Sequence, residues 1–136
     1  MAKNIECKLG HLGIRVTSLE NSIKFYETNF GFQKIRESDK PDLRLRLATL
    51  QLEDSFLELL QPYTPTIKKL AIREEKLPDI LEKTNSHIAF NVHSLADAYN
   101  QLIENNVKFA AEFNPSESKN LFCYDPDGFL IELKQK

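Results

Sequence analysis

A short motif that begins with histidine occurs twice in the chain, 76 positions apart. Residues 11–16 read HLGIRV and residues 87–92 read HIAFNV. The chain has three histidines in all, so two of them stand at the same place in a repeated pattern. The same shift superimposes Ser18-Leu19 on Ser94-Leu95. We therefore predict an internal duplication, in which one structural plan is used twice.

The repeated plan reads as strand, helix, strand. Residues alternate in the first strand, as they do when successive side chains point to opposite faces. One face would carry Leu12, Ile14 and Val16, and the other His11, Gly13 and Arg15. Ser18 and Ser94 would cap the following helices. The apolar stripes of these helices would be Leu19, Ile23, Tyr26 and Phe30 in the first copy, and Leu95, Tyr99 and Leu102 in the second.

Further strands follow each copy. Alternating or apolar patterns predict strands at 43–52 and 54–62, and two more within 119–135 around an Asp-Pro-Asp-Gly turn at 125–128. Each half is then βαβββ, with about eight strands and two main helices in total. We expect an α+β fold in a single domain, 1–136, composed of module one (8–62), a helical connector (63–84) and module two (85–135).

A glutamate lies inside the last apolar strand of each half. Glu58 follows the first histidine by 47 positions, and Glu132 follows the second by 45. A carboxylate between leucines is costly to bury without a partner, so it should face away from the apolar side of its strand. His11, Glu58, His87 and Glu132 would then share one cavity. Two imidazoles and two carboxylates are suitable ligands for one divalent transition metal ion.

Composition narrows the class of function. A net charge of −2 and an isoelectric point near 5.9 speak against nucleic-acid or membrane-surface binding, which favours basic proteins. The sequence has no apolar run of membrane-spanning length and no apolar stretch at its start, so we expect a cytoplasmic protein. Cys7 and Cys123 lack metal-site spacing and are expected to be free thiols, buried or half-buried.

These motifs resemble the vicinal oxygen chelate superfamily, which includes glyoxalases, bleomycin-resistance proteins and dioxygenases. The resemblance rests on HLGIRVTSLENSIKFYETNFGF, LELL, HIAFNV and YDPDGFLIEL. It implies paired βαβββ modules in an incomplete barrel around a metal site. Within the superfamily, His11, Glu58, His87 and Glu132 match the ligand set of glyoxalase I (lactoylglutathione lyase). Arg15 matches an arginine that contacts the glutathione carboxylate there.

Two positions depart from glyoxalase I. Pro62 stands where that enzyme has an asparagine that holds glutathione, and Lys119 is the one possible equivalent of a lysine in its glycine-rich loop. The segment around Pro62 is more similar to methylmalonyl-CoA epimerase. The identity of the thiol therefore stays open.

The expected reaction is a proton transfer through a metal-bound enediolate, on a thiol hemithioacetal of a 2-oxoaldehyde. Glu132 is the expected principal base, with Glu58 as the other candidate, and Arg15 and Asn91 would bind the small-molecule substrate. Arg44 and Arg46 alternate with leucines and face either the cavity or solvent.

Two alternatives stay open: a metal-dependent CoA-thioester epimerase and a non-catalytic small-molecule-binding or resistance protein. The metal could be Ni, Zn, Co, Mn or Fe. A homodimer is expected, because exposed strand edges need a partner, and each site could form within one chain or across the dimer.

Overall fold

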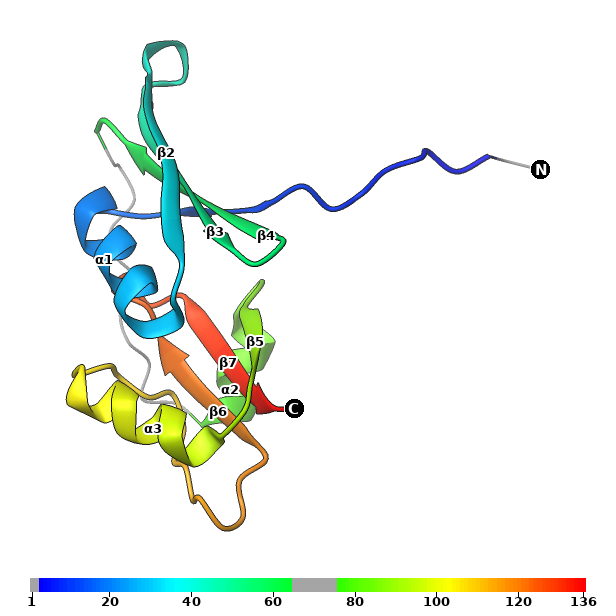
Figure 1. Ribbon diagram of the computed structural model, residues 1–136, viewed down its shortest axis with the longest axis vertical. Helices are drawn as coiled ribbons and strands as arrows, with labels where there is room; N and C mark the ends of the chain where they lie inside the picture. Colours follow the sequence, from blue (N-terminus) through cyan, green and yellow to red (C-terminus); the bar gives the residue numbers. More distant parts are fainter. Residues whose placement is uncertain (1–2, 65–75) are drawn as a thin grey trace. The chain divides into compact units, whose positions relative to one another are not determined.

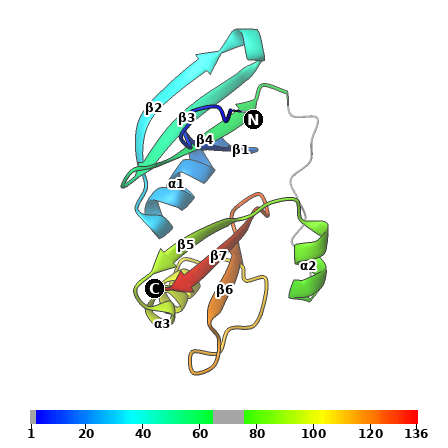
Figure 2. The ribbon, with the colours of Figure 1, turned by 90° about the vertical axis from the view of Figure 1, so that its right-hand side faces the viewer.

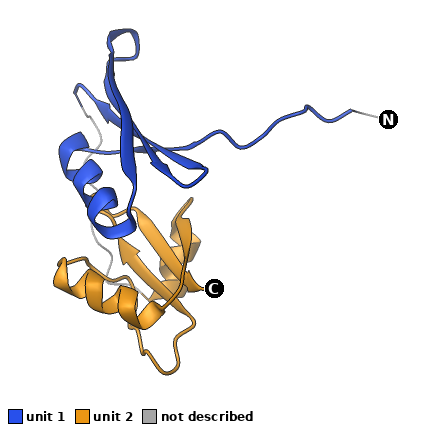
Figure 3. Cartoon of the chain, viewed as in Figure 1, with its two compact units in different colours: residues 1–65 blue, residues 66–136 orange. Residues whose placement is uncertain are grey.

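The computed structural model describes residues 3–64 and 76–136, and the chain divides into two compact units, residues 1–65 and 66–136 (Figure 3). Each unit contains one β-sheet with α-helices packed on it. Neither sheet closes into a barrel. The predicted α+β class, with a related plan in each half, is confirmed.

The first unit follows the predicted βαβββ order. It contains β1 (Leu12–Arg15), α1 (Leu19–Phe30), β2 (Gln33–Lys40), β3 (Leu45–Leu52) and β4 (Ser55–Pro62) (Figures 1 and 2). The strands are arranged β1-β4-β3-β2, with β1 parallel to β4 and the other neighbours antiparallel. The strand predicted to begin at Leu43 begins two residues later. A 3₁₀ turn, Pro41–Leu43, and a left-handed Arg44 (φ 55°) precede it.

Helix α1 packs on one face of this sheet. Its buried side chains are Leu19, Ser22, Ile23 and Tyr26, and the buried sheet residues on the facing side are Ile14, Ala48, Leu50, Leu57 and Leu59. The predicted stripe is therefore correct for its first three members, while Phe30 is half-buried. The helix ends at Gly31, whose φ of 76° requires the left-handed conformation that glycine adopts at low cost.

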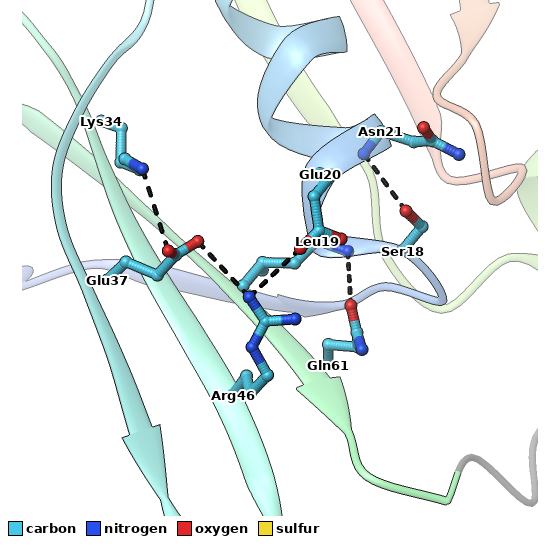
Figure 4. Close-up of polar contacts among 8 residues, drawn as sticks. All are labelled: Ser18, Leu19, Glu20, Asn21, Lys34, Glu37, Arg46 and Gln61. Carbon is cyan, nitrogen blue, oxygen red and sulfur yellow. Dashed lines mark hydrogen bonds and ion pairs between the residues drawn. The ribbon is translucent and has the colours of Figure 1, made fainter.

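The start of α1 is fastened at two points (Figure 4). Ser18 caps it, because its Oγ accepts a hydrogen bond from the backbone N–H of Asn21 at 3.2 Å. Gln61, at the end of β4, accepts a second bond at 2.6 Å from the backbone N–H of Leu19. The glutamine side chain thus joins the strand that carries Glu58 to the first turn of the helix.

Arg46 lies on the helix side of the sheet (Figure 4). Its guanidinium is 3.1 Å from a carboxylate oxygen of Glu20 in α1 and 3.8 Å from one of Glu37 in β2. The side chain shares a face with Ala48, whereas Glu58 points to the opposite face. Of the two orientations left open for Arg46, the structure shows the one directed away from Glu58.

The second unit contains α2 (Leu77–Lys83), β5 (Ile88–Val92), α3 (Leu95–Glu104), β6 (Asn120–Tyr124) and β7 (Leu130–Gln135). Its strand order is β5-β7-β6, with β5 parallel to β7. Helix α3 packs on β6 and β7, and α2 contributes the buried Ile80 to the core. Helix α2 lies inside the predicted helical connector, and residues 65–75 of that connector lie outside the described residues.

The fastening of the helix is repeated in this unit. Ser94 accepts from the backbone N–H of Asp97 at 3.2 Å, and Gln135 accepts from the backbone N–H of Leu95 at 3.0 Å. Gln61 and Gln135 each stand three residues after the glutamate of their strand. The duplication therefore preserves the attachment of strand to helix as well as the histidine and glutamate.

The second unit departs from βαβββ after α3. In place of the predicted strand there is one isolated bridge, Phe109 to Cys123, flanked by backbone bonds that Ala110 and Lys108 make to β6. The following residues form a turn in which the Asn114 side chain accepts from the backbone N–H of Ser116 at 3.0 Å. Pairing stops there for two reasons. The Asn114 side chain draws the backbone into local hydrogen bonds, and Pro115 has no N–H to donate to a neighbouring strand. The described residues therefore form seven named strands, where about eight were predicted.

The predicted Asp-Pro-Asp-Gly turn joins β6 to β7. The Asp125 carboxylate accepts from the backbone N–H groups of Asp127 (2.9 Å) and Phe129 (2.8 Å), and Gly128 has a φ of 84°. Asp125 therefore has a structural role in this turn. Burial is the main cause that raises the pKa of the Cys123 thiol to about 12, and the negative charge of Asp125 adds to it.

Both cysteines are free, as predicted. Cys123 is buried as expected, whereas Cys7 is exposed, so the expected burial is wrong for Cys7. Within the described ranges, no helix combines the length and the apolar character needed to cross a bilayer.

Candidate metal centre

The first unit brings His11 and Glu58 together. Strands β1 and β4 run parallel with Gly13 opposite Glu58, so the histidine, two residues before Gly13, is on the same face as the carboxylate. Leu57 and Leu59 point to the other face and are buried, as predicted. The imidazole Nε2 of His11 is 3.5 Å from Oε1 of Glu58, and the two side chains are 49% and 21% exposed.

The second unit brings His87 and Glu132 together in the same way. Ala89 lies opposite Glu132 in the parallel β5–β7 pair, and His87 is two residues before it. Ile131 and Leu133 are buried on the opposite face. The Nε2 of His87 is 3.1 Å from Oε1 of Glu132, and these side chains are 36% and 11% exposed.

Both separations suit two ligands of one metal ion. Bonds from zinc to imidazole nitrogen or carboxylate oxygen are about 2.0–2.2 Å, so two ligand atoms are about 3.0 Å apart at a right angle and about 3.4 Å apart at a tetrahedral angle. The observed 3.1 and 3.5 Å fit this range. In either unit, the described part of the chain gathers two such ligands and not three. Each unit therefore holds one histidine–glutamate pair of candidate ligands.

The two residues predicted to bind substrate occupy matched positions beside these pairs. Arg15 pairs with Leu60, two residues beyond Glu58, and Asn91 pairs with Lys134, two residues beyond Glu132. Both side chains are exposed and share the face of the histidine in their own strand. In each unit the predicted substrate-binding residue therefore lies on the same sheet face as the histidine–glutamate pair.

Sequence reasoning missed two polar neighbours of the second pair. Asn120, in β6, donates a hydrogen bond from Nδ2 to Oε2 of Glu132. The predicted hairpin around the turn at 125–128 could have indicated this contact. Antiparallel pairing on either side of the turn puts Asn120 opposite Lys134 and diagonal to Glu132. Lys134, on the same face and exposed, was also missed.

Comparisons with known proteins identify the family of the chain. Residues 8–133 match the model of the Glyoxalase/Bleomycin resistance protein/Dioxygenase superfamily. A lactoylglutathione lyase of Escherichia coli O157:H7 is 29% identical over 133 residues, covering 93% of this chain and 90% of the relative. The lactoylglutathione lyase of Neisseria meningitidis serogroup A is 27% identical over 132 residues, covering 95% and 91%.

Solved structures add evidence on the fold. The trypanothione-dependent glyoxalase I of Leishmania major superimposes with a TM-score of 0.76 at 27% identity, over 96% of this chain and 87% of that one. A fosfomycin resistance protein of Listeria monocytogenes, solved with Mn(II) and sulfate, has a TM-score of 0.67 at 17% identity, over 97% and 94%, and shares the fold alone. The chain belongs to the Glyoxalase/Bleomycin resistance protein/Dioxygenase superfamily.

Proposed function

We propose that the protein is a divalent-metal-dependent lyase of the glyoxalase I type, which isomerises the hemithioacetal formed by a thiol and a 2-oxoaldehyde. The observation that carries the proposal is the duplicated histidine–glutamate pair, with 3.5 Å between its ligand atoms in one unit and 3.1 Å in the other. Relatives named lactoylglutathione lyase, at 26–29% identity, support a thiol adduct as the substrate class.

In this proposal His11, Glu58, His87 and Glu132 bind one ion. Neutral imidazole and carboxylate are ligands that nickel, zinc, cobalt, manganese and iron all accept, so the donor set fits the group without selecting one metal. When bound, the ion supplies Lewis-acid polarisation of neighbouring substrate oxygens, which makes the adjacent C–H more acidic.

The chain's own residues carry the proton. The Glu132 carboxylate takes the proton from the carbon that bears the sulfur and returns it to the neighbouring carbon, while the hydroxyl proton of the hemithioacetal passes to the neighbouring oxygen. The hemithioacetal is thereby converted to a 2-hydroxy thioester without net oxidation. Glu58 is the other candidate base. Arg15 and Asn91 orient the substrate, Arg15 through an anionic group of the thiol.

The test uses the protein loaded with Ni²⁺, Co²⁺, Zn²⁺ or Mn²⁺ and methylglyoxal mixed with several thiols in turn, with formation of the thioester as the readout. A Glu132→Gln variant should lose about 10²–10⁴-fold in kcat. Glu112→Gln, an exposed glutamate of the same unit, should match the unchanged protein. A Glu132→Gln variant that keeps its metal and full turnover would remove Glu132 as the base.

A second arm assays epimerisation of a CoA thioester, because Pro62 stands where glyoxalase I has an asparagine. Epimerisation without thioester formation would replace the proposed reaction by this alternative. Metal-independent binding of small molecules without turnover would replace it by a binding or resistance role.

We also propose that the protein is a homodimer. The pairs that share an ion could then come from one chain or from two copies. Mixing and refolding His11→Ala with His87→Ala distinguishes these cases. If the pairs come from different copies, some mixed dimers regain one intact site and bind metal. If both pairs come from the same chain, mixing restores nothing.

A further inference from the structure

The two oxygens of the Glu132 carboxylate have different neighbours. Oε1 is 3.1 Å from Nε2 of His87, and Oε2 accepts the hydrogen bond from Nδ2 of Asn120. Asn120 is half-buried in β6, and the Glu132 side chain is 11% exposed. The carboxylate is therefore held from two strands, with β5 on one side and β6 on the other.

The chemistry of the amide fixes its orientation. An ionised carboxylate only accepts hydrogen bonds, so the Asn120 nitrogen, and not its oxygen, must face Glu132. A bond from an N–H to a charged acceptor is stronger than one between neutral groups, and it holds the carboxylate in one rotamer. One oxygen of Glu132 is thereby occupied, and the other is directed to the histidine.

In the described part of the first unit, Glu58 has no corresponding amide donor. Asn120 lies opposite Lys134, two residues beyond Glu132. The corresponding residue in the first unit is Leu47, which lies opposite Leu60, two residues beyond Glu58. Leucine cannot donate a hydrogen bond. Among the described residues, the contact recorded for the Glu58 carboxylate is His11 at 3.5 Å. Glu58 is thus held at one point and Glu132 at two.

We infer that Asn120 is a positioning residue of the metal site: it occupies Oε2 of Glu132 and leaves Oε1 as the single oxygen for the ion. This inference rests on the proposed function, since it requires that Glu132 is a metal ligand. Residues that hydrogen-bond to metal ligands orient them, and their loss costs about 10–100-fold in metal affinity. The second pair is on this account the more rigid half of the ligand set.

The test is a Co²⁺ titration of the full chain, read by metal affinity and by the visible absorption spectrum of the bound ion. Asn120→Leu, which keeps the approximate shape and removes the donor, should bind about 10–100-fold more weakly with an altered spectrum. Asn120→Gln keeps an amide and should recover part of the affinity. If Asn120→Leu does not fold, Asn120→Ala, which also lacks a donor, replaces it with the same expected loss.

The matched control is Asn29→Leu in α1, which removes another partly buried amide, one that donates to the backbone oxygen of Phe25 at 3.0 Å. It should bind Co²⁺ like the unchanged protein even if it unfolds more readily. Equal affinity and spectrum for Asn120→Leu and the unchanged protein would overturn the inference while leaving the proposed function intact. No uptake of Co²⁺ by the unchanged protein would overturn both.

Discussion

The two units of the chain share a plan, but the glutamate carboxylates of their histidine–glutamate pairs have different numbers of side-chain contacts. In the first unit, Glu58 meets one imidazole at 3.5 Å and lies opposite Thr49. In the second, Glu132 meets an imidazole at 3.1 Å and an amide as well. The histidine–glutamate pair and the strand-to-helix attachment occur in both units, whereas the residues on the neighbouring strand differ. The same histidine–glutamate pair is therefore held by one side-chain contact in the first unit and by two in the second.

The largest effect should come from the apolar side chains behind each carboxylate. Leu59 and Leu133 each follow a glutamate directly and are fully buried. Leu59→Ala and Leu133→Ala should each lower the free energy of unfolding by about 2–5 kcal/mol, through lost transfer energy and the cavity left behind. Urea denaturation would measure both. A value below about 1 kcal/mol for either variant would show that the two strands are not equivalent core elements.

A smaller effect should come from the glutamines that join strand to helix. Gln61→Ala and Gln135→Ala each remove an acceptor from a backbone N–H at a helix start, so each should cost about 0.5–1.5 kcal/mol in the free energy of unfolding. Gln101→Ala, on an exposed position of α3, is the control and should change little. A neutral result for both Gln61 and Gln135 would contradict the structural role given to this repeated bond.

The sequence predicted the duplicated plan and the pairs, because alternation in the strands and matched spacing are local patterns. The faces of His11 and Glu58 followed from period-two alternation around Leu57 and Leu59. The strand expected after α3 failed because a side-chain turn at Asn114 competes with pairing, and such local bonds leave a weak sequence signal. Asn120 was missed because its contact with Glu132 depends on register across a hairpin.

The smallest effect should come from the ion pair between Glu20 and Arg46 in the first unit. Hydrogen bonds from its own backbone N–H and from Arg46 lower the pKa of Glu20, whose side chain is 66% exposed. Its contribution is therefore present above its ordinary pKa of 4.5 and is lost as the pH falls through the lower folded-state pKa. Glu20→Gln should change stability at neutral pH by no more than a few tenths of a kcal/mol, and less at high salt.

That prediction is measured by denaturation at pH 7 and pH 3, in low and high salt. The difference between Glu20→Gln and the unchanged protein should shrink at pH 3 and at high salt. A difference that grows as the pH falls would contradict the direction of the pKa shift.

The central claim, that two separated pairs bind one ion, is tested most directly by metal content. The unchanged protein and the single variants His11→Ala and His87→Ala would be purified without chelator, saturated with the same divalent ion, dialysed and analysed. We predict about one ion per chain in the unchanged protein and loss of that ion in both variants. If either variant keeps its ion at full occupancy, the ion belongs to one pair alone, and the claim is contradicted.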